Sequence, residues 1–171
     1  MKSILISIQP QWVAMIIHGK KTLEIRKTMP KCELPCKVYI YCSWGDERTS
    51  YMLGKRGKVV AEFTLNNAEE VVHYNNELQN KSQVSTKAFF DYKGNGKAYA
   101  WHIDNLKIYD EPKDIRQFKK QCSCYQPMSY EKIGCFEKGC PIYELGECDG
   151  KCIYLDRPPQ SWCYVEGLYE N

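Results

Sequence analysis

The chain has 171 residues, 43% of them hydrophobic and 26% charged, and its formal net charge is +3; these values are usual for a single globular domain. No run of about 18 apolar residues occurs, and Ser7 interrupts the first apolar stretch, so we expect neither a membrane span nor a secretory signal. Positive charge is concentrated in the first 60 residues, which hold 11 Lys+Arg against 4 Asp+Glu. This third is the candidate anion-facing part, unless folding interleaves it with the rest.

A strand and a helix are predicted at the start of the chain. Residues 3–8 form a short apolar run that is typical of a strand. Pro10 suits the first turn of a helix, and four apolar residues then recur at helical spacing: Trp12, Val13, Ile16 and Ile17. Gly19 follows at the position where a left-handed residue commonly ends a helix.

The period of the apolar pattern changes to two over residues 22–27. Leu23 and Ile25 are expected on one face of a strand, and Glu24 and Arg26 on the other. Further strands are predicted at 37–42, 58–65, 97–103, 106–109 and 161–166. The polar stretches 43–57 and 66–96 are interpreted as loops or short helices. Several short strands and one early helix indicate an α+β domain built on a mixed sheet, closed as a small barrel.

The turn after the first helix and the strand that follows it place three charged groups together. Gly19 delivers Lys21 to the start of the strand, and the two-residue period puts Glu24 and Arg26 about 6 to 7 Å apart on one face. A carboxylate can accept a hydrogen bond from an exocyclic amine, while Lys or Arg can hold a phosphate or a carbonyl oxygen. This pattern suits a nucleotide. An ordinary solvated strand face, with Glu24 and Arg26 paired to each other, is the alternative.

The pattern Gly19-x-Lys21-x-x-Glu24-x-Arg26 resembles the signature of the ASCH family, G-x-K-x-x-E-x-R, in all four positions. The segments Tyr99-Ala100-Trp101-His102-Ile103 and Arg157 to Glu166 are similar to those of longer bacterial and prophage-type members. The resemblance implies a PUA-like β-barrel and a cavity that binds RNA or a nucleotide, often with a modified base. By motif position, this binding role falls on Lys21, Glu24 and Arg26.

One branch of the same family implies an enzyme. Its small bacterial members are amidohydrolases that remove the acetyl group of N4-acetylcytidine with a Lys and a Thr of this motif and a Glu from elsewhere. This chain keeps Lys21, but Glu24 stands where that branch has its Thr. Lys21 with Glu24 would supply a general base only if burial lowered the pKa of the lysine. We therefore expect a binding module, with an amidohydrolase of an N4-acylated cytidine-type substrate as the alternative.

Three further residues are candidates for ligand binding. Trp44 lies in a polar loop beside a glycine and can stack on a base, or can simply cover the barrel. His102 lies on the face of its strand opposite Trp101, where either the site or a structural hydrogen bond would occupy it. Arg157 precedes two prolines that stiffen the segment, which suits phosphate binding or a hydrogen bond to backbone carbonyls. Trp101 and Trp162 lie in alternating strands and are expected in the core.

Six of the ten cysteines lie in a predicted insertion at about residues 121–155. Four of them are separated by four, seven and three residues and suit one structural zinc ion: Cys135, Cys140, Cys148 and Cys152. Cys122 or Cys124 can replace one of these four. Free thiols, or disulfides in an exported chain, are the alternatives. Such a tetrathiolate site would be structural, because it has no open coordination position.

These patterns together give the following expectations for the whole chain. Residues 1–171 form one ASCH/PUA-like domain of a cytoplasmic protein, with the Cys-rich insertion at about 121–155 as an elaboration. RNA or a nucleotide is the expected ligand, and no organic cofactor and no membrane contact are expected. The Cys-rich insertion can also contact a protein partner, which would make the chain an interaction module.

Overall fold

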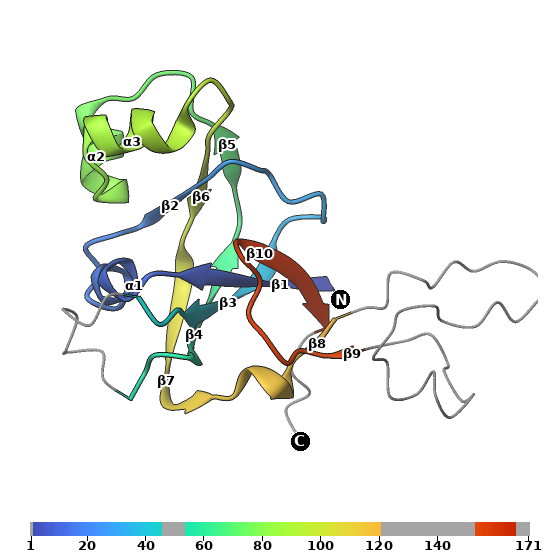
Figure 1. Cartoon of the computed structure of the whole chain (residues 1–171). Coiled ribbons are helices and arrows are strands. Elements are labelled where there is room, and N and C mark those ends of the chain that lie inside the picture. The colour runs from blue at the N-terminus through green and yellow to red at the C-terminus, as the bar shows by residue number, and fades with distance from the viewer. Residues whose placement is uncertain (1, 46–53, 121–152, 167–171) are drawn as a thin grey trace, which may run out of the picture.

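The computed structural model describes residues 2–45, 54–120 and 153–166. Its elements are β1 (Lys2–Ile8), α1 (Pro10–Ile17), β2 (Leu23–Arg26), β3 (Cys36–Cys42), β4 (Lys58–Leu65), β5 (Ala68–Glu70), α2 (Asn76–Ser82), α3 (Thr86–Lys93), β6 (Tyr99–His102), β7 (Asp104–Lys113), the 3₁₀-helix η2 (Ile115–Gln117), β8 (Lys119–Lys120), β9 (Ile153–Tyr154) and β10 (Trp162–Glu166). In these ranges no helix is long and apolar enough to cross a membrane. The predicted α+β class is confirmed (Figure 1).

The strands form a five-stranded sheet in the order β10-β1-β3-β4-β7, a three-stranded sheet in the order β2-β6-β5, and the pair β8-β9. β1 and β3 run parallel, and the other pairs are antiparallel. β6 and β7 are separated only by Ile103, and β4 and β5 only by residues 66–67. Each of these two segments therefore passes from one sheet into the other. Among the described residues the strands form linked open sheets rather than one closed ring.

The alternation of side chains along β1 places two cores on opposite faces of the five-stranded sheet. Ile4 and Ile6 belong to the larger core, which also contains Val13 and Ile16 of α1. Leu5 points to the other face and joins a cluster that includes Tyr109 and Phe118. Burying one aliphatic side chain of this kind stabilises the fold by about 1.5–3 kcal/mol. The larger core thus packs β1 against α1, the two elements that precede β2 in the chain.

The segment 66–96, predicted as loops or short helices, contains β5 and the helices α2 and α3. Both helices begin with a side-chain cap: Asn75 accepts a hydrogen bond from the Leu78 N–H, and Ser85 accepts one from the Ala88 N–H. The helices pack beside the three-stranded sheet (Figure 1). There Phe89 forms a third core with residues of β2 and its neighbours: Leu23, Ile25, Val71, Ala98 and Ala100.

The strand predicted at 106–109 is longer in the structure, where β7 runs from Asp104 to Lys113. It includes Pro112, which was expected to follow the end of this strand. β7 is an edge strand of the five-stranded sheet. A proline is tolerated at such an edge because its missing N–H needs no partner there.

Candidate ligand-binding site

The turn after α1 delivers Lys21 to the start of β2. Gly19 has φ +71, the left-handed conformation that favours glycine, and its N–H donates to the Ile16 carbonyl. The N–H groups of Lys20 and Lys21 both donate to the carbonyl of Met15, at 2.9 and 3.1 Å. The chain is thus folded back on the end of α1. The predicted glycine cap is confirmed.

The Lys21 side chain is almost completely buried, with 2% of its surface exposed. Its ammonium donates to the Ser82 carbonyl at 2.5 Å and lies 3.3 Å from Glu24 Oε2. Ser82 ends α2, so the ammonium occupies the negative end of that helix. The ammonium also lies 5.2 Å from the centre of the Trp12 ring. Burial lowers the pKa of Lys21 from its usual 10.5, while the Glu24 carboxylate opposes this shift.

Glu24 and Arg26 project from β2 on the face opposite Leu23 and Ile25, as the two-residue period predicted. Arg26 Nη2 lies 3.1 Å from Glu24 Oε1 and donates to the Ser7 carbonyl at 2.7 Å. Its Nη1 donates to Ser161 Oγ at 3.2 Å. The Nε atom of Arg26 is buried and has no hydrogen-bond partner among the described residues. Arg26 therefore connects β2 to β1 and to the chain before β10, while its Nε–H makes no hydrogen bond within the described residues.

The solvated strand face, the alternative that the sequence left open, is not what the structure shows. Glu24 and Arg26 are only 7% and 8% exposed, and β2 is buried on both faces. Each oxygen of the Glu24 carboxylate faces a different cation, Lys21 on one side and Arg26 on the other. Two cations share one anion in a buried place, so the cluster carries a net positive charge. An anionic or strongly dipolar ligand would complete the charge balance.

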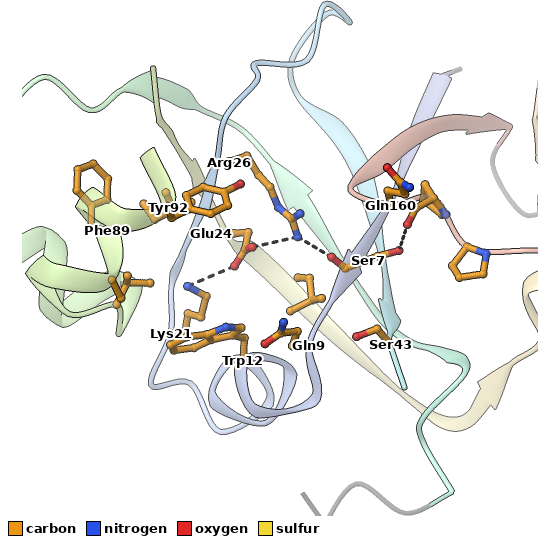
Figure 2. A pocket seen from close by; sticks show the side chains of 16 residues that line it. Ser7, Gln9, Trp12, Lys21, Glu24, Arg26, Ser43, Phe89, Tyr92 and Gln160 are labelled. Atoms are coloured by element: carbon orange, nitrogen blue, oxygen red, sulfur yellow. Dashed lines mark hydrogen bonds and ion pairs between the residues drawn. The ribbon is translucent and has the colours of Figure 1, made fainter. Parts of the chain in front are cut away.

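A cavity of about 440 Å³ lies against this cluster, within the range of small-molecule sites. Figure 2 shows Lys21, Glu24 and Arg26 in a row that continues to Ser7, with Trp12 below and Tyr92 above. Four other segments of the chain complete the wall. They are the end of β1 with the start of α1 (Ser7, Ile8, Gln9, Trp12), Ser43 directly after β3, the chain before α3 with α3 itself (Val84, Ala88, Phe89, Tyr92), and residues 158–160.

Two further contacts fix the walls of the cavity. Ser7 Oγ donates to the Pro159 carbonyl at 2.7 Å, which fastens residues 158–160 beside β1. On the opposite side, Tyr92 lies one helical turn after Ala88, so both face the cavity from α3. Burial raises the pKa of the Tyr92 phenol, which stays neutral and able to donate a hydrogen bond.

Three of the residues predicted for the site lie outside the cavity lining. The Trp44 side chain is 69% exposed and its ring lies against Gly57. His102 Nε2 lies 3.1 Å from Glu69 Oε1, on the side of β6 toward β5. Arg157 is exposed, although the two prolines after it do line the cavity. Trp101, expected in the core, is fully buried there.

Several lining residues were not predicted from the sequence. The helical spacing of Trp12 indicates the core face of α1, but this residue is only partly buried and its ring lies beneath Lys21. The sequence signal for a role of Trp12 in the site was its position shortly before the motif that begins at Gly19. Tyr92 and Phe89 come from α3, and Gln160 from the other end of the chain. No local pattern relates these residues to β2, because only the tertiary fold brings them together.

The predicted zinc ligands, Cys122, Cys124, Cys135, Cys140, Cys148 and Cys152, lie outside the described residues, so the zinc site and the insertion stay predictions. Within residues 2–45, 54–120 and 153–166, no group of three or more Cys, His, Asp or Glu side chains could hold a metal ion. Cys32 and Cys36 are free thiols with their sulfur atoms 3.4 Å apart.

Comparison with solved structures identifies the fold. The ASCH protein of Zymomonas mobilis matches 96% of this chain and 87% of its own, with 19% identity and a TM-score of 0.50. One single-residue variant of that protein gives 18% identity and a TM-score of 0.58 over 96% of this chain and 88% of its own. Another single-residue variant gives 20% identity and a TM-score of 0.53, and the match covers 75% of this chain and 87% of that variant. No protein-family model matches the sequence, and no curated protein matches it significantly.

The α+β fold of the chain is therefore similar to that of these solved structures, which are 18–20% identical to it. More particularly, the chain has the fold of an ASCH-domain protein. This confirms, at the level of the fold, what the pattern from Gly19 to Arg26 predicted. The prophage type stays a prediction.

Proposed function

We propose that the chain binds RNA or a nucleotide and that the cavity over Lys21, Glu24 and Arg26 receives the base and part of the attached phosphate or sugar. The single observation that carries this proposal is the burial of two cations against one anion at the wall of an open cavity. Such a cluster is costly to desolvate and is retained where it serves recognition or catalysis. A ligand with negative charge and hydrogen-bonding edges offsets that cost.

Aromatic side chains on two sides of the cavity support a planar ligand. Trp12 and Tyr92 lie on opposite sides of the row of charged groups (Figure 2). Stacking of a base on such a ring contributes on the order of 1–3 kcal/mol. A nucleobase between the two rings would place its polar edge toward Lys21 and Glu24. The Nε–H of Arg26, which has no partner in the described part of the chain, is a donor for a carbonyl or phosphate oxygen.

The test is the affinity of the chain for the four ribonucleoside monophosphates and for four short homo-oligoribonucleotides, measured by calorimetry and fluorescence anisotropy. Lys21→Met removes a charged hydrogen bond, which contributes about 1.5–3 kcal/mol, so the best ligand should bind about tenfold to a hundredfold more weakly. Lys20→Met is the matched control, because Lys20 is exposed and carries the same charge. It should bind as the wild type does.

A second variant separates binding from folding. Tyr92→Ala removes an aromatic wall but none of the three charged side chains of the cluster, and it should weaken binding. If Lys21→Met and Tyr92→Ala both bind every ligand as tightly as the wild type, the cavity is not the site and the proposal is refuted.

One observation favours hydrolysis of an acylated cytidine as a second candidate function. Burial lowers the pKa of Lys21 beside the cavity, which is the direction of shift that a lysine needs in order to serve as a general base. The neutral amine would take a proton from a water molecule that attacks the acyl carbonyl. The C–N bond then breaks, the amine of the base leaves with a proton, and acetate is released. Glu24 at 3.3 Å would hold the lysine in place.

Acetate release from N4-acetylcytidine tests this second function. Turnover by the wild type and by Lys20→Met, with none by Lys21→Met, would establish it. A wild type that binds the nucleoside without releasing acetate would leave the binding function alone.

A further inference from the structure

Trp44 is a large aromatic side chain held at the surface next to the cavity, and it does not line the cavity. Its side chain is 69% exposed, whereas most large aromatic rings in globular proteins are largely covered. One part of the ring is nevertheless in contact with the protein. It lies against Gly57, where an added Cβ would come within 2.8 Å of the indole ring. Gly57 has φ +73 and therefore suits glycine for a second reason.

The backbone that carries Trp44 is continuous with the wall of the cavity. Ser43 lines the cavity, and its N–H donates to the carbonyl of Ile8, another lining residue, at 2.9 Å. On the other side, Gly45 packs on Pro10, where an added Cβ would lie 2.6 Å from the proline ring. Trp44 thus stands between two anchored residues, one of which faces the cavity, and its own ring is turned outward. A chain-like ligand leaving the cavity past Ser43 would reach this ring next.

Among the described residues, two cations lie close to the segment that carries the Trp44 ring. Lys55 and Arg56 directly precede Gly57, on which the ring lies. Both are close enough to Cys42, at the end of β3, to act on its thiol electrostatically. An exposed aromatic ring beside cations is the arrangement with which proteins hold single-stranded nucleic acid, stacking a base while cations accompany the phosphates.

We propose that Trp44 is a second stacking position, outside the cavity, for the nucleotide adjacent to the one that the cavity holds. This inference rests on the proposed function and extends it: the preferred ligand is a single strand of RNA rather than a free nucleotide. The cavity holds one base, the strand passes Ser43, and the next base stacks on Trp44 with its phosphate near Lys55.

The experiment compares two ligands of the same base, the ribonucleoside monophosphate that binds best and a short homo-oligoribonucleotide. Trp44→Ala should weaken binding of the oligonucleotide about tenfold, the fold-change expected for one lost base stack, and leave the monophosphate unchanged. Trp44→Phe should retain most of the oligonucleotide affinity because it retains a ring. Tyr154→Ala is the matched control, since Tyr154 is a 59% exposed aromatic residue on β9.

Fluorescence quenching gives a second readout. The chain has four tryptophans, of which Trp44 is the most exposed and Trp101 is fully buried. Acrylamide should therefore quench mainly Trp44, and the oligonucleotide should protect it while the monophosphate should not.

The outcomes distinguish this inference from the proposed function. If Lys21→Met weakens both ligands but Trp44→Ala weakens neither, the second stacking position is refuted and the cavity function stands. If Trp44→Ala weakens both ligands equally, Trp44 acts on the cavity itself and the inference is also refuted. If the wild type binds neither ligand, the proposed function fails and this inference fails with it.

Discussion

Replacing Glu24 by glutamine should destabilise the chain more than replacing either cation around it. Among the described residues, Glu24 is the anion that contacts both the Lys21 ammonium and the Arg26 guanidinium, at 3.3 and 3.1 Å. Glutamine keeps the size and a hydrogen-bonding oxygen but removes the negative charge. Glu24→Gln thus leaves two buried cations next to each other without this counterion.

The size of this effect can be bounded in two ways. Removing one partner of a buried ion pair costs about 3–5 kcal/mol. The chain can also escape by releasing the Lys21 proton, and from a usual pKa of 10.5 this costs about 5 kcal/mol at pH 7. The first argument gives a loss of about 3–5 kcal/mol in the free energy of unfolding, and the second sets an upper limit of about 5 kcal/mol. Lys21→Met should cost less than about 3 kcal/mol, because it loses the charged bond to Ser82 but leaves Glu24 and Arg26 as a neutral pair.

Urea denaturation at neutral pH, with the free energy of unfolding and the m-value fitted for each variant, measures these losses. The double variant should lose less than the sum of its two single variants, because the single losses share one interaction. If the free energy of unfolding of Glu24→Gln lies within about 1 kcal/mol of the wild-type value, the loss is that of an ordinary surface substitution and the electrostatic reasoning is wrong. It is also wrong if Lys21→Met lowers the free energy of unfolding more than Glu24→Gln does.

Three further outcomes are expected. Burial lowers the pKa of Lys21 in the folded chain, so between that lowered value and 10.5 the unfolded chain binds more protons than the folded chain. This group therefore makes the free energy of unfolding rise with pH. Lys21→Met should lose that rise when urea curves are compared across the alkaline range. Parallel pH profiles would contradict this. Burial raises the pKa of Cys36 to about 12 and of Cys42 to about 11, so iodoacetamide at about pH 8 should label the less buried Cys32 before these two thiols, as peptide mass spectrometry would show; equal rates for the three would refute it. Phe89→Ala, at a side chain that is 2% exposed, should cost about 3–5 kcal/mol in urea unfolding, and a loss below about 1 kcal/mol would contradict its role in the third core.

The residues of the motif show how far local patterns reach. The two-residue period of β2 correctly separated Glu24 and Arg26 from Leu23 and Ile25, because alternation is a property of the strand itself. Gly19 marked the turn for the same local reason. Burial of the charged face was not predictable in this way, since it depends on α3 and on residues 158–160, which pack there only in the folded chain.

Trp12 and Trp44 show that local patterns do not locate the cavity. The helical spacing of Trp12 matches that of a core residue, but the ring lies at the border of the core where the cavity begins. The loop composition around Trp44 favoured a place in the site, yet this residue lies outside the cavity lining. Spacing and composition report which side of an element is apolar, and they carry no information on where a cavity opens along it.

A crystal structure of the chain with its best-binding ribonucleotide tests the central claim most directly. We expect the base between Trp12 and Tyr92, with polar atoms of the nucleotide within hydrogen-bond distance of Lys21 and Arg26. A nucleotide bound elsewhere on the surface, with the cavity beside Glu24 empty, would contradict the account.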